Sequence, residues 1–494
     1  MTQWKTLGAS AAISALLGSG AVWADVTADQ VWDSWSGSLE AFGYTVATGS
    51  EQRAGDTLVL TNVVLSMTQP EGDFEITLSE IRLKETGDGK VSVTVPNEIP
   101  LVAKAEPDSA TTVDITMMLR QQGLALLVSG SESDMAYDTS ATEISVDVEA
   151  IESAGTSAPV KLLFTATDLA GAYSIATEGG QQANSELSVA KVSLAASGAD
   201  PSTNATFNMN GAMQDLSSVT ELFLPDGVDM NDMAAAVAGG FYVDSEISFG
   251  AGNYAMEFTD DAGSGTVTTQ GDGGMFFVSL SGEGMEYGVE GNAFSVSMLV
   301  PDLPVPIDFA LQGTSFLLSM PISKGEESQS FAVKLGLAGL SVSEQIWAMG
   351  DPLAQLPHTP FDLMVDLSGS AKLLVNLFDP TEVQSVPLPA EVEAVDINEV
   401  HLAALGADLS GTGAFTFDNS MGMPIPNGAV DMRLVGAYAL MDKLSAMGML
   451  PPDQVAGFRA MLGLFSVPAG DDVLTSKIEI RDDGGVYANG QRLQ

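Results

Sequence analysis

The chain has 494 residues, with 65 acidic and 18 basic side chains, a formal net charge of −47 at pH 7, and no cysteine. So strong a negative charge repels nucleic-acid backbones and anionic lipid surfaces, and we expect no nucleic-acid partner. Without cysteine the chain can form no disulfide, no thiolate metal ligand and no cysteine-linked lipid anchor. Burial of apolar side chains must therefore hold the fold together.

The first 24 residues have the features of a secretory signal peptide. A single charged residue, Lys5, precedes a small and apolar run over residues 7–17, and Val22-Trp23-Ala24 matches the small-residue rule for cleavage. We expect cleavage after Ala24 and export to the periplasm, which removes Lys5 and leaves a side-chain charge of −48. The alternative is a retained anchor, since residues 6–23 carry no charge. No later stretch is long and apolar enough to span a membrane.

A helix is predicted directly after this segment. Thr27 and Gln30 have the spacing of a capping box, in which each side chain satisfies a backbone N–H of the first turn. Apolar residues then recur every three or four positions, which places them on one helix face, and Gly43 ends the pattern. The residues of this face are Val31, Trp35, Leu39 and Phe42.

From residue 57 onward the apolar period changes from about 3.6 to 2, which predicts strands. The alternation in residues 74–84 changes phase at Ser79-Glu80, and a change of this kind marks a bulge or bend that curves a sheet. Gly-rich turns such as residues 271–274 and 282–284 follow at short intervals, which favours an antiparallel meander over β-α-β units. Further alternating runs lie at residues 91–95, 144–148, 187–189, 254–258 and 361–367, and the closing residues 477–494 read as two short strands around a turn.

Helical periodicity returns weakly at residues 231–238, briefly at 343–349 and strongly near the C-terminus. A Pro451-Pro452-Asp453 start signal separates two late apolar stripes. The first stripe comprises Leu440, Leu444 and Met447, and the second comprises Val455, Phe458, Leu462 and Phe465.

Together these elements predict a fold that is mainly β with some α. A strand, a Leu-Pro pair, a short helix and a strand occur at residues 207–248 and again at 432–480, which suggests a loose duplication. We therefore expect two curved antiparallel β-sheet halves, 25–240 and 241–494, with a few amphipathic helices packed on their concave faces.

Residues with catalytic or metal-binding chemistry are sparse. His358 lies in a proline-rich loop and His401 in a strand-like run, so a shared metal site is not expected. Ser188 and Lys191 have Ser-x-x-Lys spacing, but in a strand we expect residues three apart to lie on opposite faces. Because no nucleophile elbow, phosphate loop or dinucleotide fingerprint occurs, we expect a non-enzymatic protein without cofactor or metal.

Several late segments carry a family resemblance, namely 346–352, 356–360, 404–413, 450–454 and 487–493. Taken together, they resemble the bacterial envelope family known as domain of unknown function 2125, over a range from about residue 27 to the C-terminus. A fainter likeness, in the N-terminal helix, the long meander and the closing strand, is to periplasmic proteins of the AsmA and YdgA kinds. The second likeness implies a link to envelope lipid homeostasis, in some members as hydrophobic conduits.

The positive functional signal is apolar. The chain has 23 methionines, several of them near the late helices, and methionine suits surfaces that accept variable apolar shapes. We expect a groove between curved sheets and helices that binds lipid or another apolar ligand, lined by the helix residues named above, with a role in envelope homeostasis. The alternative is a structural or protein-interaction module of the envelope, in which the same residues form solid cores and a protein partner binds outside.

Overall fold

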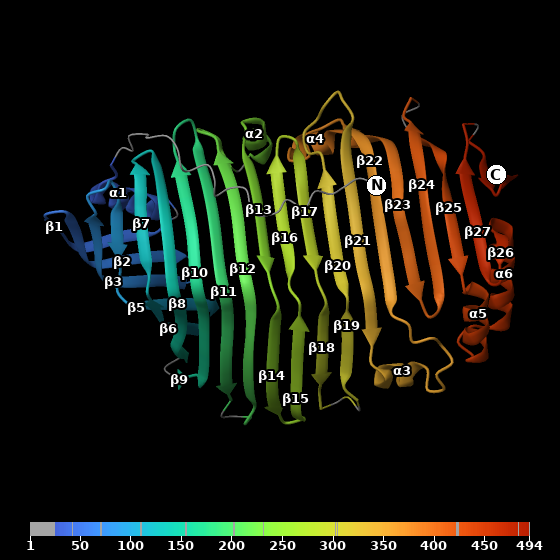
Figure 1. Ribbon diagram of the computed structural model, residues 1–494, viewed down its shortest axis with the longest axis horizontal. Coiled ribbons are helices and arrows are strands. Elements are labelled where there is room, and N and C mark those ends of the chain that lie inside the picture. Colours follow the sequence, from blue (N-terminus) through green and yellow to red (C-terminus); the bar gives the residue numbers. More distant parts are fainter. Residues whose placement is uncertain are drawn as a thin grey trace.

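One continuous antiparallel sheet dominates the computed structural model (Figure 1). The structure describes residues 25–41, 43–69, 72–108, 111–153, 156–200, 203–230, 232–301, 303, 305–420, 424–482 and 484–493. The expected signal peptide, residues 1–24, and its cleavage site lie outside the described residues, as does Phe42. The mainly β architecture with a few helices is confirmed.

Strands follow one another almost without interruption. They are β1 (Thr45–Ala54), β2 (Thr57–Gln69), β3 (Gly72–Glu85), β4 (Val91–Thr94), β5 (Glu98–Asp108), β6 (Thr111–Gln122), β7 (Ala125–Ser131), β8 (Asp134–Ser153), β9 (Thr156–Ser157), β10 (Val160–Ala176), β11 (Gln181–Ala199), β12 (Thr206–Leu224), β13 (Tyr242–Phe249), β14 (Gly252–Asp260), β15 (Gly263–Gly271), β16 (Gly274–Ser281), β17 (Gly284–Gly291), β18 (Phe294–Leu299), β19 (Ile307–Leu311), β20 (Gly313–Met320), β21 (Gln329–Val342), β22 (Phe361–Leu373), β23 (Ala390–Ala404), β24 (Ala407–Asp418), β25 (Ile425–Val435), β26 (Val467–Gly470), β27 (Val473–Ile480), β28 (Val486–Ala488) and β29 (Gln491–Arg492).

The described helices lie at the start of the strand region and in four connections between strands. Five were expected from periodicity, and α4, whose first turn is capped by Asp379, was not. The helices are α1 (Ala28–Ala41), α2 (Met233–Ala238), α3 (Glu344–Gly350), α4 (Pro380–Ser385), α5 (Ala437–Ala446) and α6 (Pro452–Phe465).

Neighbouring strands in the sequence are neighbours in the sheet, as a meander requires. In the middle of the sheet, pairs of short strands lie end to end. Both β13 and β14 pair with β12, and on their other edge β13 pairs with β16 and β14 with β15. Pairing therefore runs without a break across residue 240, where the two expected halves meet, and a single sheet contains both.

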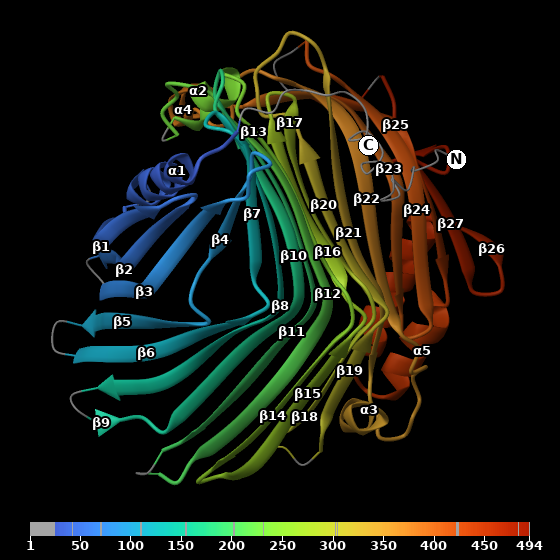
Figure 2. The same cartoon turned by 60° about the vertical axis from the view of Figure 1, so that its left-hand side comes forward.

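The sheet bends along a line that crosses its strands (Figure 2). At this line one residue per strand drops out of the hydrogen-bonded pairing while the register continues unchanged on either side. Several of these residues have a positive φ, a conformation that turns the chain sharply within a strand. They are Asn62 (φ 52°), Asp168 (φ 51°), Asp215 (φ 51°), Gly273 (φ 95°) and Gly339 (φ 63°).

Helix α1 lies inside the bend, against the first strands (Figure 2). Its Val31 is fully buried with Leu60 and Val63 of β2 and Leu83 of β3 in the larger of the two buried cores. These strand residues come from both sides of the bend line, so the helix occupies the angle between the two parts of each strand. We call the sheet face that carries α1 the apolar face and the opposite face the polar face.

Candidate functional site

The apolar face continues far beyond the part that α1 covers. Residues paired in register share one face, so the face can be followed from strand to strand. Starting beneath α1, one such row contains aromatic, aliphatic and hydroxyl side chains only. The row is Tyr137, Tyr173, Ser185, Thr220, Ser245, Val278, Tyr287, Leu318, Val333, Leu367 and Ile397.

Charge is nearly absent from this face in a strongly acidic protein. Among the register-paired residues of the described strands β8 to β27, the one charged side chain on the apolar face is Asp260, at the β14–β15 hairpin. Many large apolar side chains on the face remain open to solvent, because no described element lies over them as α1 does at the first strands. Those at least 36% exposed are Phe164, Tyr173, Ile247, Phe249, Tyr287, Phe294, Phe316, Leu335 and Leu402.

The polar face has the complementary composition. In β8, Asp138 and Asp147 alternate with the apolar-face residues Tyr137 and Val148, and the same alternation continues through the later strands. Open hollows lie on this side, one of about 730 Å³, and their lining mixes apolar side chains such as Leu127 with polar ones such as Ser188 and Glu186. Since these hollows are shallow and open, they enclose an apolar ligand poorly.

Groups of aromatic rings interrupt the aliphatic surface, among them the Phe294–Phe309 pair with centroids 6.5 Å apart. At the covered end, Trp35 of α1 stacks on Tyr137 with ring centroids 6.4 Å apart, and Tyr137 contacts Tyr173 at 5.8 Å. Further along, Tyr287 meets the edges of Phe276 at 5.2 Å and Phe316 at 5.8 Å. Pairs of this geometry stabilise more than their buried area alone.

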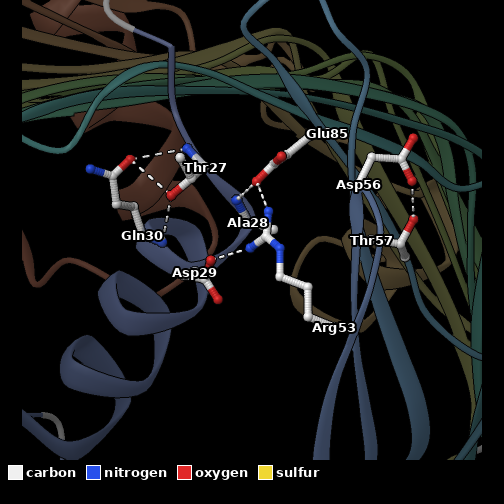
Figure 3. Close-up of polar contacts among 8 residues, drawn as sticks. All are labelled: Thr27, Ala28, Asp29, Gln30, Arg53, Asp56, Thr57 and Glu85. Carbon is white, nitrogen blue, oxygen red and sulfur yellow. Dashed lines mark hydrogen bonds and ion pairs between the residues drawn. The ribbon is translucent and has the colours of Figure 1, made fainter.

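Polar contacts hold the start of α1 in place (Figure 3). The capping box is confirmed: the Thr27 N–H donates to Gln30 Oε1 (3.0 Å) and the Gln30 N–H donates to Thr27 Oγ1 (3.3 Å). Glu85 of β3 accepts the Ala28 N–H (3.1 Å) and also pairs with Arg53 of β1.

Arg53 completes the connection by pairing with Asp29 in the first turn of α1. The hydrogen bond from Arg53, followed by that from the Ala28 N–H, lowers the pKa of Glu85 below its ordinary value. We call Asp29, Arg53 and Glu85 the α1 latch, because they tie the helix to β1 and β3.

The residues predicted to line a groove fall into two separate sets. Val31 is buried, while Trp35 and Leu39 are half-buried on α1. The late set lies on α5 and α6, at the opposite end of the sheet (Figure 1), so the structure does not bring the two sets together. Within it, Val455 is buried, Leu440, Leu444, Met447 and Leu462 are half-buried, and Phe458 and Phe465 are exposed.

Sequence reasoning missed the strand residues of the apolar face as candidate site residues. The alternation in runs such as residues 361–367 indicated strands but not which face stays uncovered. Only the three-dimensional arrangement shows that the helices leave most of this face open.

The two histidines lie in separate environments. His358 stacks on Trp347 at 4.5 Å, and its Nδ1 lies 2.8 Å from Glu344 Oε2. Nearby, the buried Asp351 accepts the Leu356 N–H (2.6 Å), and backbone N–H groups of Gln355 and Leu356 are the main cause of its lowered pKa. These contacts close the α3 loop.

His401 is on the polar face of β23, with Nε2 3.3 Å from Asp408 Oδ2. Within the described parts of the chain no group of three or more His, Asp or Glu side chains could hold a metal ion.

Ser188 and Lys191 correct an expectation about strand geometry. Both lie on the polar face, because Ala190 drops out of the pairing at the bend and shifts the alternation by one residue. Ser188 Oγ donates to the Ala170 carbonyl (3.2 Å), as a surface hydroxyl on a strand does, so the side chain is already engaged.

Comparison with known proteins gives a family but no activity. The model of the domain of unknown function 2125 family, described as an uncharacterized protein conserved in bacteria, matches residues 245–493. The chain belongs to this family. The match begins in β13, well after residue 27, where the sequence resemblance was expected to start. No curated protein and no solved structure matches the chain. None of the described helices has the length and apolar character to cross a membrane.

Proposed function

We propose that this family member is an exported, non-enzymatic periplasmic protein that binds the acyl chains of lipids on its apolar face. The observation that carries the proposal is the apolar face between β8 and β27, much of which is uncovered. Among its register-paired residues in the described strands, Asp260 is the one charged side chain. Contiguous exposed apolar patches beyond a few hundred Å² are unusual on soluble monomers and mark binding surfaces. A role in envelope lipid homeostasis follows from this ligand class.

The length of the face favours hydrocarbon chains over a compact apolar ligand. At about 4.8 Å per strand spacing, the face extends about 60 Å from β8 to β27. One leaflet of a bilayer has an apolar thickness of about 15 Å, half of the core of about 30 Å, so several acyl chains fit end to end.

Binding at this face is energetically sufficient without a charged anchor. Burying 12 methylenes at about 0.8 kcal/mol each gives about 10 kcal/mol before association costs of several kcal/mol. Since none of the register-paired residues described on this face is cationic, an anionic headgroup would have to remain at its margin, and we expect neutral or zwitterionic lipids to bind best.

Neighbouring residues of β10 provide a matched test. Phe164 lies on the apolar face and Leu163 on the polar face, and each side chain is 41% exposed. Phe164→Glu places a charge among the bound chains, whereas Leu163→Glu places it in water. Lipids that copurify from cells are extracted and quantified by mass spectrometry, and uptake of a fluorescent fatty acid is titrated.

We expect lipid to copurify with the native chain, Phe164→Glu to bind less lipid, and Leu163→Glu to bind as the native chain does. A native protein that arrives without lipid and takes up no fluorescent fatty acid would refute lipid binding. Equal losses in both variants would show that the apolar face is not the binding surface.

A protein-interaction module is the second candidate, and the late helices favour it. Several large apolar side chains near α3, α5 and α6 are more than half exposed, which suits a protein partner. Under this alternative, substitutions there abolish partner binding while copurified lipid is absent. These residues are Met349, Leu353, Met449, Met461 and Leu464.

A further inference from the structure

The covered end of the apolar face finishes in a wall of three adjoining rings, of which the first two are stacked and the third is tilted. Trp35 projects from α1, Tyr137 from β8 and Tyr173 from β10, so the rings lead from the helix onto the open surface. Trp35 and Tyr137 are packed against the buried core, whereas Tyr173 is 40% exposed. The last ring therefore presents one side to the uncovered part of the face.

Short side chains leave room beside this wall. The residues that follow Tyr173 in its row, on β11, β12 and β13, are Ser185, Thr220 and Ser245. The Thr220 and Ser245 hydroxyls bond to each other at 2.8 Å, so they satisfy one another without water. The next large ring in the row is Tyr287. At about 4.8 Å per strand, the stretch of short side chains between Tyr173 and Val278 of β16 is nearly 20 Å long.

The wall is anchored and not merely packed. The α1 latch joins the first turn of the helix to β1 and β3, and the fully buried Val31 fixes the next turn. Trp35 follows Val31 by four residues and so lies on the same helix face. A ligand lying along the row therefore meets a rigid end at Tyr137 and Tyr173, not a hinged flap.

We propose that Trp35, Tyr137 and Tyr173 form the terminal seat of the lipid site and bind the methyl end of an acyl chain whose headgroup points toward β27. This proposal rests on the lipid binding proposed above. The rings offer an apolar surface with no cation nearby on the face, so a terminal methyl group loses nothing there, whereas a phosphate or carboxylate would be left unpaired. Partial burial, followed by the neighbouring Tyr137, raises the pKa of the Tyr173 hydroxyl.

Trp35 serves as a built-in reporter of chain orientation. The native protein is loaded with phosphatidylcholine that carries bromine either near the methyl end or near the carbonyl of its acyl chains, and tryptophan fluorescence is recorded. The same measurement on Trp35→Phe identifies the part of the signal that belongs to Trp35, since Trp32 and Trp347 also remain after the expected cleavage at Ala24. Bound lipid is quantified in every sample by mass spectrometry.

We expect methyl-end bromine to quench the Trp35 signal and carbonyl-end bromine to leave it nearly unchanged. Stronger quenching by carbonyl-end bromine would overturn the proposed orientation. Bound lipid without any quenching of Trp35 would overturn the terminal seat while leaving the lipid function intact. Absence of bound lipid in the native chain would overturn both.

A second pair of variants tests the seat without disturbing the rings. Ser185→Phe fills the space beside Tyr173, and Ser188→Phe adds the same ring to the polar face of the same strand. Ser185→Phe should abolish methyl-end quenching while the remaining face still binds lipid, and Ser188→Phe should quench like the native chain. Unchanged quenching in Ser185→Phe would show that the chain end does not lie there.

Discussion

The α1-covered end of the sheet and the more open stretch from β10 to β27 carry the same apolar alternation in different surroundings. Under α1, Leu60 and Leu83 are fully buried. On the open stretch, Leu335 of β21 is 45% exposed, although its strand alternates just as regularly. The strand pattern therefore specifies which face is apolar, and a separate element decides whether that face becomes a core.

This difference assigns the two regions different roles. Where another element of the chain covers the apolar face, the burial of its side chains contributes to the free energy of unfolding. Where the face is uncovered, the free energy of burying its side chains is gained only when a ligand or partner binds. The same sheet can then be a stable scaffold at one end and a binding surface along the rest.

The largest expected effect comes from removing one leucine in each region. Leu60→Ala leaves a cavity beneath α1 and should lower the free energy of unfolding by about 2–5 kcal/mol. Leu335→Ala removes a side chain that is already half in water, and about 1 kcal/mol or less is expected. Chemical denaturation of the lipid-free proteins compares the two.

Similar losses at both positions would mean that the open stretch is covered in solution, and the comparison between the two regions would fail. A second measurement on lipid-loaded protein sharpens the test. If lipid fills the face, Leu335→Ala should cost more in the loaded protein than in the free one.

A smaller effect is expected at the bend line of the open stretch, where no helix supports the sheet. Gly273 has φ 95°, and a Cβ there would lie 2.1 Å from the Phe249 carbonyl oxygen. Gly273→Ala should lower the free energy of unfolding by about 1–3 kcal/mol. The control is Gly282→Ala, where the nearest atom to a new Cβ is 3.9 Å away and a change within about 0.5 kcal/mol is expected. If both variants melt alike, the bend does not depend on this backbone conformation.

The sequence predicted much of the fold because period-2 alternation and Gly-rich turns are local signals. Five helices, the capping box at Thr27, and the closing β27–β28 strands follow directly from such signals. The bend was identified from the sequence at Ser79, where the apolar phase changes within a single strand. Its continuation through Asp168 and Asp215 was not, because a non-glycine residue with positive φ has no distinctive sequence pattern.

The candidate site was harder to predict than the fold. Periodicity pointed to the apolar faces of α1, α5 and α6, since a helix must bury its stripe. It could not show that α1 and α6 lie at opposite ends of one sheet, or that Phe164 and Leu163 on neighbouring positions differ in what they face. Such facts depend on strand order and register over long distances, which local patterns do not encode.

The smallest effect is expected at the α1 latch, and it tests whether α1 can detach while the sheet stays folded. Hydrogen bonds from Arg53 and the Ala28 N–H lower the pKa of Glu85, so its ionised form favours the folded state. This contribution is present above the ordinary carboxyl pKa of about 4.3 and is lost as the pH falls through the lowered folded-state pKa. Because Glu85 is 29% exposed, about 1 kcal/mol or less is expected.

Hydrogen exchange of the α1 amides measures the effect directly. Glu85→Gln should speed exchange in residues 28–41 at neutral pH and should remove most of the acid-dependent loss of protection seen in the native chain. Glu80→Gln breaks the Arg82 pair on the same strand and should leave α1 unchanged. If Glu85→Gln lowers protection across the whole sheet instead, α1 unfolds with the scaffold, and the covered and open regions form one cooperative unit.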